Sequence, residues 1–109
     1  MAEYPRLSTK AEEVLRKLRL MRHVDWLIDD LERMTSWARA CNIPRVLLEA
    51  GEARDHYKEI MDLLDEASAK DMITVDEWDI STSALKELRD RYIEITVNIL
   101  KERCGCSRW

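Results

Sequence analysis

Apolar side chains recur every three or four residues through nearly the whole chain, a spacing that predicts amphipathic α-helices. The two glycines and two prolines fall near breaks and ends of these patterns, with Gly51 as the exception. The alternation typical of a strand occurs once, inside a longer helical pattern, at Ile93, Ile95, Val97 and Ile99. The pattern therefore predicts an all-α protein.

The first predicted helix begins near Thr9 and runs toward Ala40, because no glycine or proline interrupts it. Thr9 and Glu12 have the spacing of a capping box. The segment CNIPR then ends the helix, since Pro44 disfavours helical backbone at the residue before it. At about 1.5 Å per residue, a helix of this length approaches about 48 Å.

A second predicted helix spans residues 44–69, and a third spans residues 84–103. The apolar seam of the second helix alternates steps of four and three residues: Val46, Ala50, Ala53, Tyr57, Ile60, Leu64 and Ala67. The seam of the third helix is Leu85, Leu88, Tyr92, Ile95 and Ile99. Thr74 and Glu77 predict a capping box ahead of it, followed by DISTS, which is poor helix material. A short extra helical turn before the last helix is therefore an open alternative.

The connections between these helices are short, so sequential helices are expected to be antiparallel neighbours. We expect an up-down-up bundle of three long helices in one domain over residues 1–109, with residues 1–8 and 104–109 as terminal extensions. No apolar run approaches the roughly 20 residues that a membrane span needs. The N-terminal segment also lacks the apolar stretch of a secretory signal. A cytoplasmic protein with no membrane partner is the expectation.

The composition indicates a heat-adapted source. The chain contains no glutamine and two asparagines, while 37% of its residues are charged. Few thermolabile amides beside many ionic side chains is a bias found in proteins that work at high temperature. Helical proteins in general are also rich in ionic residues, which is the alternative explanation of the same bias.

Three cysteines are expected at one pole of the bundle. Cys41 ends the first predicted helix, and Cys104 and Cys106 follow the last one. A zinc site needs four ligands, but His23 and His56 lie roughly 27 Å and 18 Å from this pole along their helices. We therefore predict a disulfide from Cys41 to either Cys104 or Cys106, against the alternative of three independent cysteines. A cytosolic disulfide would also agree with a heat-adapted source.

Two surfaces carry more apolar area than one bundle seam requires. The first is a stripe along the first predicted helix at nearly heptad spacing: Leu15, Arg19, Arg22, Trp26, Arg33 and Trp37. The second is a patch on the last predicted helix: Ile93, Val97 and Leu100. Exposed patches of this size are uncommon on monomers, and Trp and Arg are enriched at binding hot spots. These residues predict an interaction surface, most simply that of a homodimer, with another protein partner as the alternative.

Nucleic acid is an unlikely partner for the stripe. Residues 1–22 contain six Lys or Arg against three acids, but the chain as a whole has a net charge of −4. Binding to a nucleic-acid backbone needs several phosphate contacts and a basic field.

The segment EAGEARDHYKEIMD, residues 49–62, raises the question of a metal site, because it holds five carboxylates and a histidine. On a helical wheel most of these acids lie opposite the apolar seam, which predicts a solvated face. A strip beside the seam keeps metal binding open as an alternative: Glu49, Glu52, His56 and Glu59.

The pairs Glu49-x-x-Glu52 and Glu59-x-x-Asp62 resemble the motif of all-α MazG-type nucleotide pyrophosphohydrolases. In that family the two pairs are well separated and face each other from different helices, whereas six residues separate them here on one helix. The resemblance implies a metal-dependent nucleotide hydrolase as an alternative function, and no activity is carried over from it.

The leading hypothesis is a non-catalytic helical interaction module. No Ser-His-Asp arrangement, phosphate-cradling glycine loop or nucleotide fingerprint occurs in the chain. We therefore assign no catalytic residue, no resident metal and no cofactor.

Overall fold

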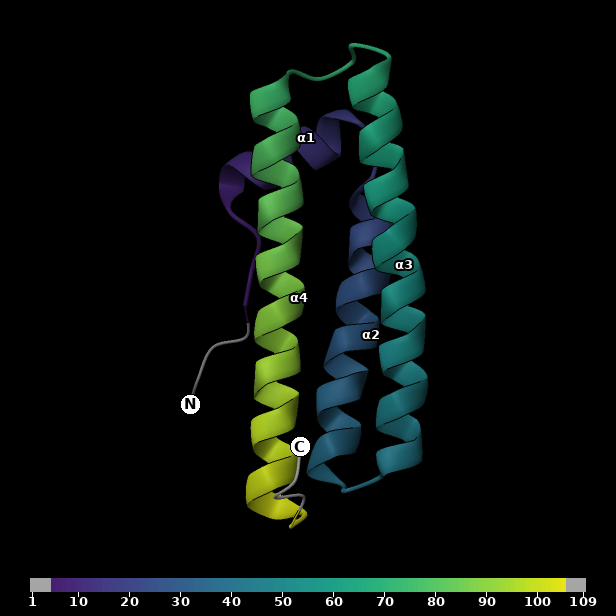
Figure 1. Cartoon of the computed structure of the whole chain (residues 1–109), viewed down its shortest axis with the longest axis vertical. Helices are drawn as coiled ribbons and strands as arrows, with labels where there is room; N and C mark the ends of the chain where they lie inside the picture. Colours follow the sequence, from purple (N-terminus) through teal and green to yellow (C-terminus); the bar gives the residue numbers. More distant parts are fainter. Residues whose placement is uncertain (1–4, 106–109) are drawn as a thin grey trace.

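The computed structural model describes residues 5–105, which form four helices and no strand. The helices are α1 (Thr9–Lys17), α2 (Met21–Arg39), α3 (Ile43–Ala69) and α4 (Val75–Arg103). The three long helices α2, α3 and α4 run along the long axis with alternating direction, and α1 is turned across one end of them (Figure 1). The predicted all-α class is confirmed. The predicted count of three helices is wrong, because the first predicted helix is two helices.

The break between α1 and α2 is a Schellman turn. Arg19 has left-handed backbone, with φ 59°. The amide of Leu20 donates to the carbonyl of Leu15 at 2.8 Å, and the amide of Arg19 donates to that of Arg16 at 3.0 Å. This pair of hydrogen bonds ends α1, and burial of both Leu15 and Leu20 supplies the apolar contact that accompanies the motif.

The same turn ends α2 and α3, where Cys41 and Asp71 have φ 55° and 56°. Gly105, which follows α4, also has left-handed backbone, with φ 68°. Of these four left-handed positions only the last is a glycine, the residue that normally marks a helix end in a sequence. The break at Arg19 carries no such mark, which is why the sequence predicts an uninterrupted helix there.

The turn allows α1 to cover the part of α4 that α2 does not reach. With 19 residues, α2 is about 28 Å long, whereas α4 with 29 residues is about 43 Å long. The short helix α1 packs on α4 near the end that joins α3 (Figure 1). Its buried side chains join the common core, together with Leu7 from the segment expected to be a terminal extension: Ala11, Val14 and Leu15.

The helix starts are only partly as predicted. The capping box of Thr74 and Glu77 is confirmed, since each side chain accepts a hydrogen bond from the other residue's amide at 3.0 Å and 2.9 Å. At α1 the cap is Ser8, whose hydroxyl accepts from the amide of Ala11 at 3.2 Å, so the box expected from Thr9 and Glu12 does not form.

No separate turn precedes the last helix, because α4 is continuous from Val75. The hydroxyls of Ser81 and Thr82 donate to the carbonyls of Glu77 and Asp79, so they remain inside the helix without competing for its amides.

The predicted seam of α3 is confirmed, with five of its members buried and Ala50 and Tyr57 half-buried. The seam of α4 rotates in its second half. Thr96 and Leu100 are buried there, whereas the predicted Ile95 and Ile99 are half-buried. None of the helices in residues 5–105 combines the length and apolarity that crossing a bilayer requires.

A disulfide joins Cys41 to Cys104, with their Cα atoms 5.5 Å apart. Cys41 follows α2 and Cys104 ends α4, so the bond ties two parallel helices at the pole where the sequence placed the cysteines. Cys106 lies outside the described residues.

Replacing Arg19 by Gly should raise the free energy of unfolding by about 1 kcal/mol, because glycine adopts left-handed backbone without the strain of a side chain. Denaturant unfolding followed by circular dichroism measures the change. The control Glu13→Gly, inside α1, should lower stability by a similar amount. If Arg19→Gly were destabilising, the turn would not be where the structure has it.

Replacing both Cys41 and Cys104 by Ser should lower the free energy of unfolding by about 4 kcal/mol in the chain-entropy model, since the bridge spans a sequence separation of 63 residues. Thermal unfolding without reductant measures the loss, and Cys106→Ser serves as the control that should not change it. Alkylation of the denatured wild-type protein should modify one thiol of the three. Three modified thiols would rule the bridge out.

Candidate functional site

An aspartate is buried between α2 and α3. Asp30 lies on the apolar face of α2, three residues after Leu27 and four before Met34, and only 1% of it is exposed. One carboxylate oxygen accepts a hydrogen bond from Nη2 of Arg33, and the other lies 2.5 Å from Nδ1 of His56 on α3. Both oxygens are therefore partnered, as a buried carboxylate requires.

Arg33 joins this aspartate to a second buried carboxylate. Its Nε donates to Oε2 of Glu49 at 3.3 Å, and Glu49 is 6% exposed. The hydrogen bond that Arg33 donates to Glu49, followed by the one that it donates to Asp30, raises the pKa of Arg33 above its ordinary value. One guanidinium thus compensates two carboxylates that come from facing helices.

One carboxylate oxygen from each of Asp30, Glu49 and Glu52 lies within 4.8 Å of the other two. Oxygen ligands from two facing helices are what a bundle offers to a hard divalent cation. The solvated face predicted for α3 is confirmed at Asp55 and Asp62, but Glu49 is buried and faces α2.

The alternative metal strip is only partly assembled. Glu49 and Glu52 come together, but His56 contacts Asp30, and Glu59 lies 3.7 Å from Nδ1 of His23. Asp30 is the member that the sequence analysis missed. The sequence contains a signal for it, because Asp30 stands three residues after Leu27 and four before Met34 and therefore lies on the apolar stripe of its helix.

The predicted interaction stripe is divided by the turn at Arg19. Leu15 and Leu100 are buried in the core, so they are corrected from interaction residues to core residues. Trp37 is half-buried against the core, with Arg45 over its ring. Trp26 is 44% exposed and lies between the rings of two histidines, with centroid distances of 5.3 Å to His23 and 6.0 Å to His56.

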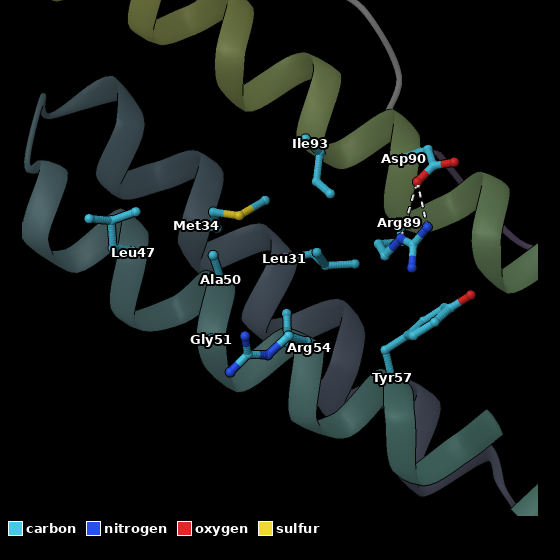
Figure 2. Close-up of a pocket in the computed structure, with 11 residues that line it drawn as sticks. Leu31, Met34, Leu47, Ala50, Gly51, Arg54, Tyr57, Arg89, Asp90 and Ile93 are labelled. Carbon is cyan, nitrogen blue, oxygen red and sulfur yellow. Dashed lines mark hydrogen bonds and ion pairs between the residues drawn. The ribbon is translucent and has the colours of Figure 1, made fainter. Parts of the chain in front are cut away.

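An apolar groove of about 600 Å³ lies between α3 and α4. Figure 2 shows Leu31 and Met34 of α2 at its floor, with Ile93 pointing into it from α4. Leu47 lines it at the start of α3 and is 59% exposed. The groove thus reaches down to the core between two helices that contact each other less than either contacts α2.

Small residues on α3 keep this groove open. Ala50, Gly51 and Ala53 line its wall, and a Cβ added to Gly51 would meet no atom within 4 Å. Three alanines on a seam normally permit close helix approach, but here α4 does not approach α3 at this level. At one end of the groove the guanidinium of Arg89 lies 4.5 Å from the centre of the Tyr57 ring (Figure 2). The same guanidinium donates a hydrogen bond to Asp90.

Comparisons with protein-family models, curated proteins and solved structures find no match to this chain. Its function is therefore argued from the polar cluster on α2 and α3 and from the groove.

Replacing Arg33 by Gln should lower the free energy of unfolding by roughly 1–3 kcal/mol, because Asp30 and Glu49 lose their shared cation while they stay buried. Denaturant unfolding at neutral pH measures the loss. The control Arg91→Gln removes an exposed arginine outside the groove and should change stability by less than about 0.5 kcal/mol. Equal effects of the two substitutions would show that the cluster does not stabilise the fold.

Proposed function

We propose that the protein is a non-catalytic helical interaction module that forms a homodimer through the groove between α3 and α4. The observation that carries the proposal is the groove itself, an apolar channel floored by the core residues Leu31 and Met34. Filling such a channel removes apolar surface from water, which is the main driving force of association.

The face around the groove supports a second copy as the occupant, because it is self-complementary. A two-fold interface uses the same patch on both subunits, so the patch must hold both a cavity and a side chain that fills it. Leu47, which is 59% exposed, lines the groove at the start of α3, so the same helix supplies both the small residues Ala50 and Gly51 and an apolar side chain free to enter the groove of a second copy.

The rim of the groove also suits association of identical chains. It carries Arg54 on α3 and Asp90 on α4, so both signs of charge are present on one face. Like charges directly opposed would disfavour a dimer, whereas two-fold symmetry allows each sign to meet the other.

Part of the interaction surface expected from the sequence belongs to this face. Ile93 is 44% exposed and lines the groove, and Val97, four residues further along α4, is half-buried. The stripe residues Trp26 and Trp37 do not line the groove, so the proposed dimer does not require them.

Replacing Gly51 by Leu tests the dimer, because the new side chain has room within one chain and fills the channel. Light scattering at micromolar concentration should give about twice the 12.9 kDa of one chain for the wild type and one chain mass for Gly51→Leu. The fold should be preserved, since leucine has a helix propensity about 0.8 kcal/mol better than that of glycine.

Val75→Ser is the matched control, because it removes an exposed apolar side chain at the start of α4, outside the groove. It should leave association unchanged. A monomeric wild-type protein, or a Gly51→Leu variant that still dimerises, would refute the proposal.

A metal-dependent hydrolase is the second candidate, favoured by the proximity of Asp30, Glu49 and Glu52. For a cation to bind, Arg33 would have to leave its ion pairs with Asp30 and Glu49. Calorimetric titration with Mn²⁺ and Mg²⁺ decides: heat that disappears in Asp30→Asn supports this candidate, and absence of heat in the wild type ends it.

The proposal places the module in the cytoplasm of a heat-adapted cell. The lack of glutamine and the high content of charged residues support the heat-adapted source, and the bond between Cys41 and Cys104 fits a cytoplasmic location in such a source. Intracellular disulfides are rare except in hyperthermophiles.

A further inference from the structure

A cluster of arginines surrounds the turn between α1 and α2. The segment VLRKLRLMRHV, residues 14–24, contains four Lys or Arg and no acid, in a chain whose net charge is −4. Three of them line a concavity of about 460 Å³ together with Met21 and His23: Arg16, Arg19 and Arg22. Positive charge is thus concentrated at one hollow of an otherwise acidic molecule.

These three arginines lack partners within residues 5–105. Arg16, Arg19 and Arg22 form neither ion pairs nor side-chain hydrogen bonds there. The fourth cation, Lys17, instead pairs with Glu77 at 3.4 Å. Neighbouring guanidinium groups repel one another, and an anion bound between them would offset that repulsion.

The start of α2 borders the same hollow, because its first three residues, Met21, Arg22 and His23, line it. Its N-cap is Leu20, which offers no side-chain hydrogen bond, and its first turn contains no acidic residue. The first amides of a helix have no acceptor within the helix, and they carry the positive end of its dipole. The last carbonyls of α1 do not use these donors, because they accept from Leu18, Arg19 and Leu20.

An exposed indole lies one helical turn from the hollow. Trp26 follows Arg22 by four residues, about 6 Å along α2. Its ring meets His23 edge-on, at an interplanar angle of 86°, and 44% of the residue is exposed. Nδ1 of His23 is buried without a hydrogen bond, and the nearest acid to it is Glu59 at 3.7 Å. The spacing suits a ligand in which a sugar separates an anion from a planar ring.

We propose that this hollow binds the phosphate group of a small phosphate ester whose planar ring rests on Trp26. Arginine and helix N-termini both favour phosphate, and tryptophan stacks on planar rings. The volume lies within the usual range of ligand pockets, about 300–1,000 Å³. A long nucleic-acid strand fits less well, because it needs several phosphate contacts, whereas Asp25 and Asp29 follow directly along α2. The site does not involve the groove between α3 and α4.

Calorimetric titration with four probes separates the two parts of the site. AMP carries phosphate, sugar and ring, and ribose 5-phosphate carries phosphate and sugar. Adenosine carries sugar and ring without phosphate, and inorganic phosphate has neither sugar nor ring. AMP should bind about tenfold more tightly than ribose 5-phosphate, because one stacked base contributes that much or more. Inorganic phosphate should bind most weakly of the three phosphates, and adenosine should give no measurable heat.

Two variants test which residues contact the phosphate and which contact the ring. Arg19→Gln with Arg22→Gln should weaken AMP and ribose 5-phosphate alike, by roughly a hundredfold, since each lost charge-assisted hydrogen bond is worth about tenfold. Trp26→Leu should weaken AMP about tenfold and leave ribose 5-phosphate unchanged. Circular dichroism should show that both variants keep their helicity, because the three replaced side chains are exposed.

A double variant that removes two positive charges elsewhere controls for the electrostatic field of the whole molecule. Lys58→Gln with Lys86→Gln takes away two exposed cations outside the hollow and should leave AMP binding within about twofold of wild type. The proposal is overturned if AMP gives no heat at millimolar concentration, or if this control weakens AMP as much as the arginine variant does. It is also overturned if adenosine binds as well as AMP. A single-stranded oligonucleotide that binds more than tenfold more tightly than AMP would also overturn it, because the ligand would then be a nucleic acid and not a small phosphate ester.

Discussion

Each helix of this chain ends at a residue with left-handed backbone, and the turn at Arg19 determines how the other elements are arranged. Because α1 folds away from α2 there, its apolar face covers the end of α4 instead of prolonging α2. The same turn leaves the start of α2 uncapped and brings Arg16, Arg19 and Arg22 around one hollow. A single backbone conformation thus shapes both the core and a charged surface.

The packing of α2 explains why one side of the bundle is closed and the other is open. Between α2 and α3, the buried Asp30 and Glu49 are joined through Arg33, and His56 adds a further contact to Asp30. Buried charges require such partners, so this network constrains how the two helices face each other. Among residues 5–105 no comparable network of buried charges joins α3 to α4, and small side chains around Gly51 leave the groove.

Features that depend on nearby residues could be predicted from the sequence. The capping box at Thr74 and Glu77 and the seam of α3 are set by spacings within one helix. The pole shared by Cys41 and Cys104 follows from antiparallel order. The break at Arg19 was not predictable in this way, because an arginine occupies the position where glycine is the usual signal. Leu100 was misassigned because the seam of α4 rotates within the helix.

By itself, therefore, the sequence determined the helical class, the alternating direction of the long helices and the pole at which the cysteines meet. These follow from local hydrogen bonding, the periodicity of apolar side chains and short connections. Only the tertiary structure decided that Asp30 meets Glu49, that the arginines of two helices share one hollow, and that α3 and α4 stand apart. Such contacts depend on the rotation and separation of whole helices, which packing across the core sets and no single helix encodes.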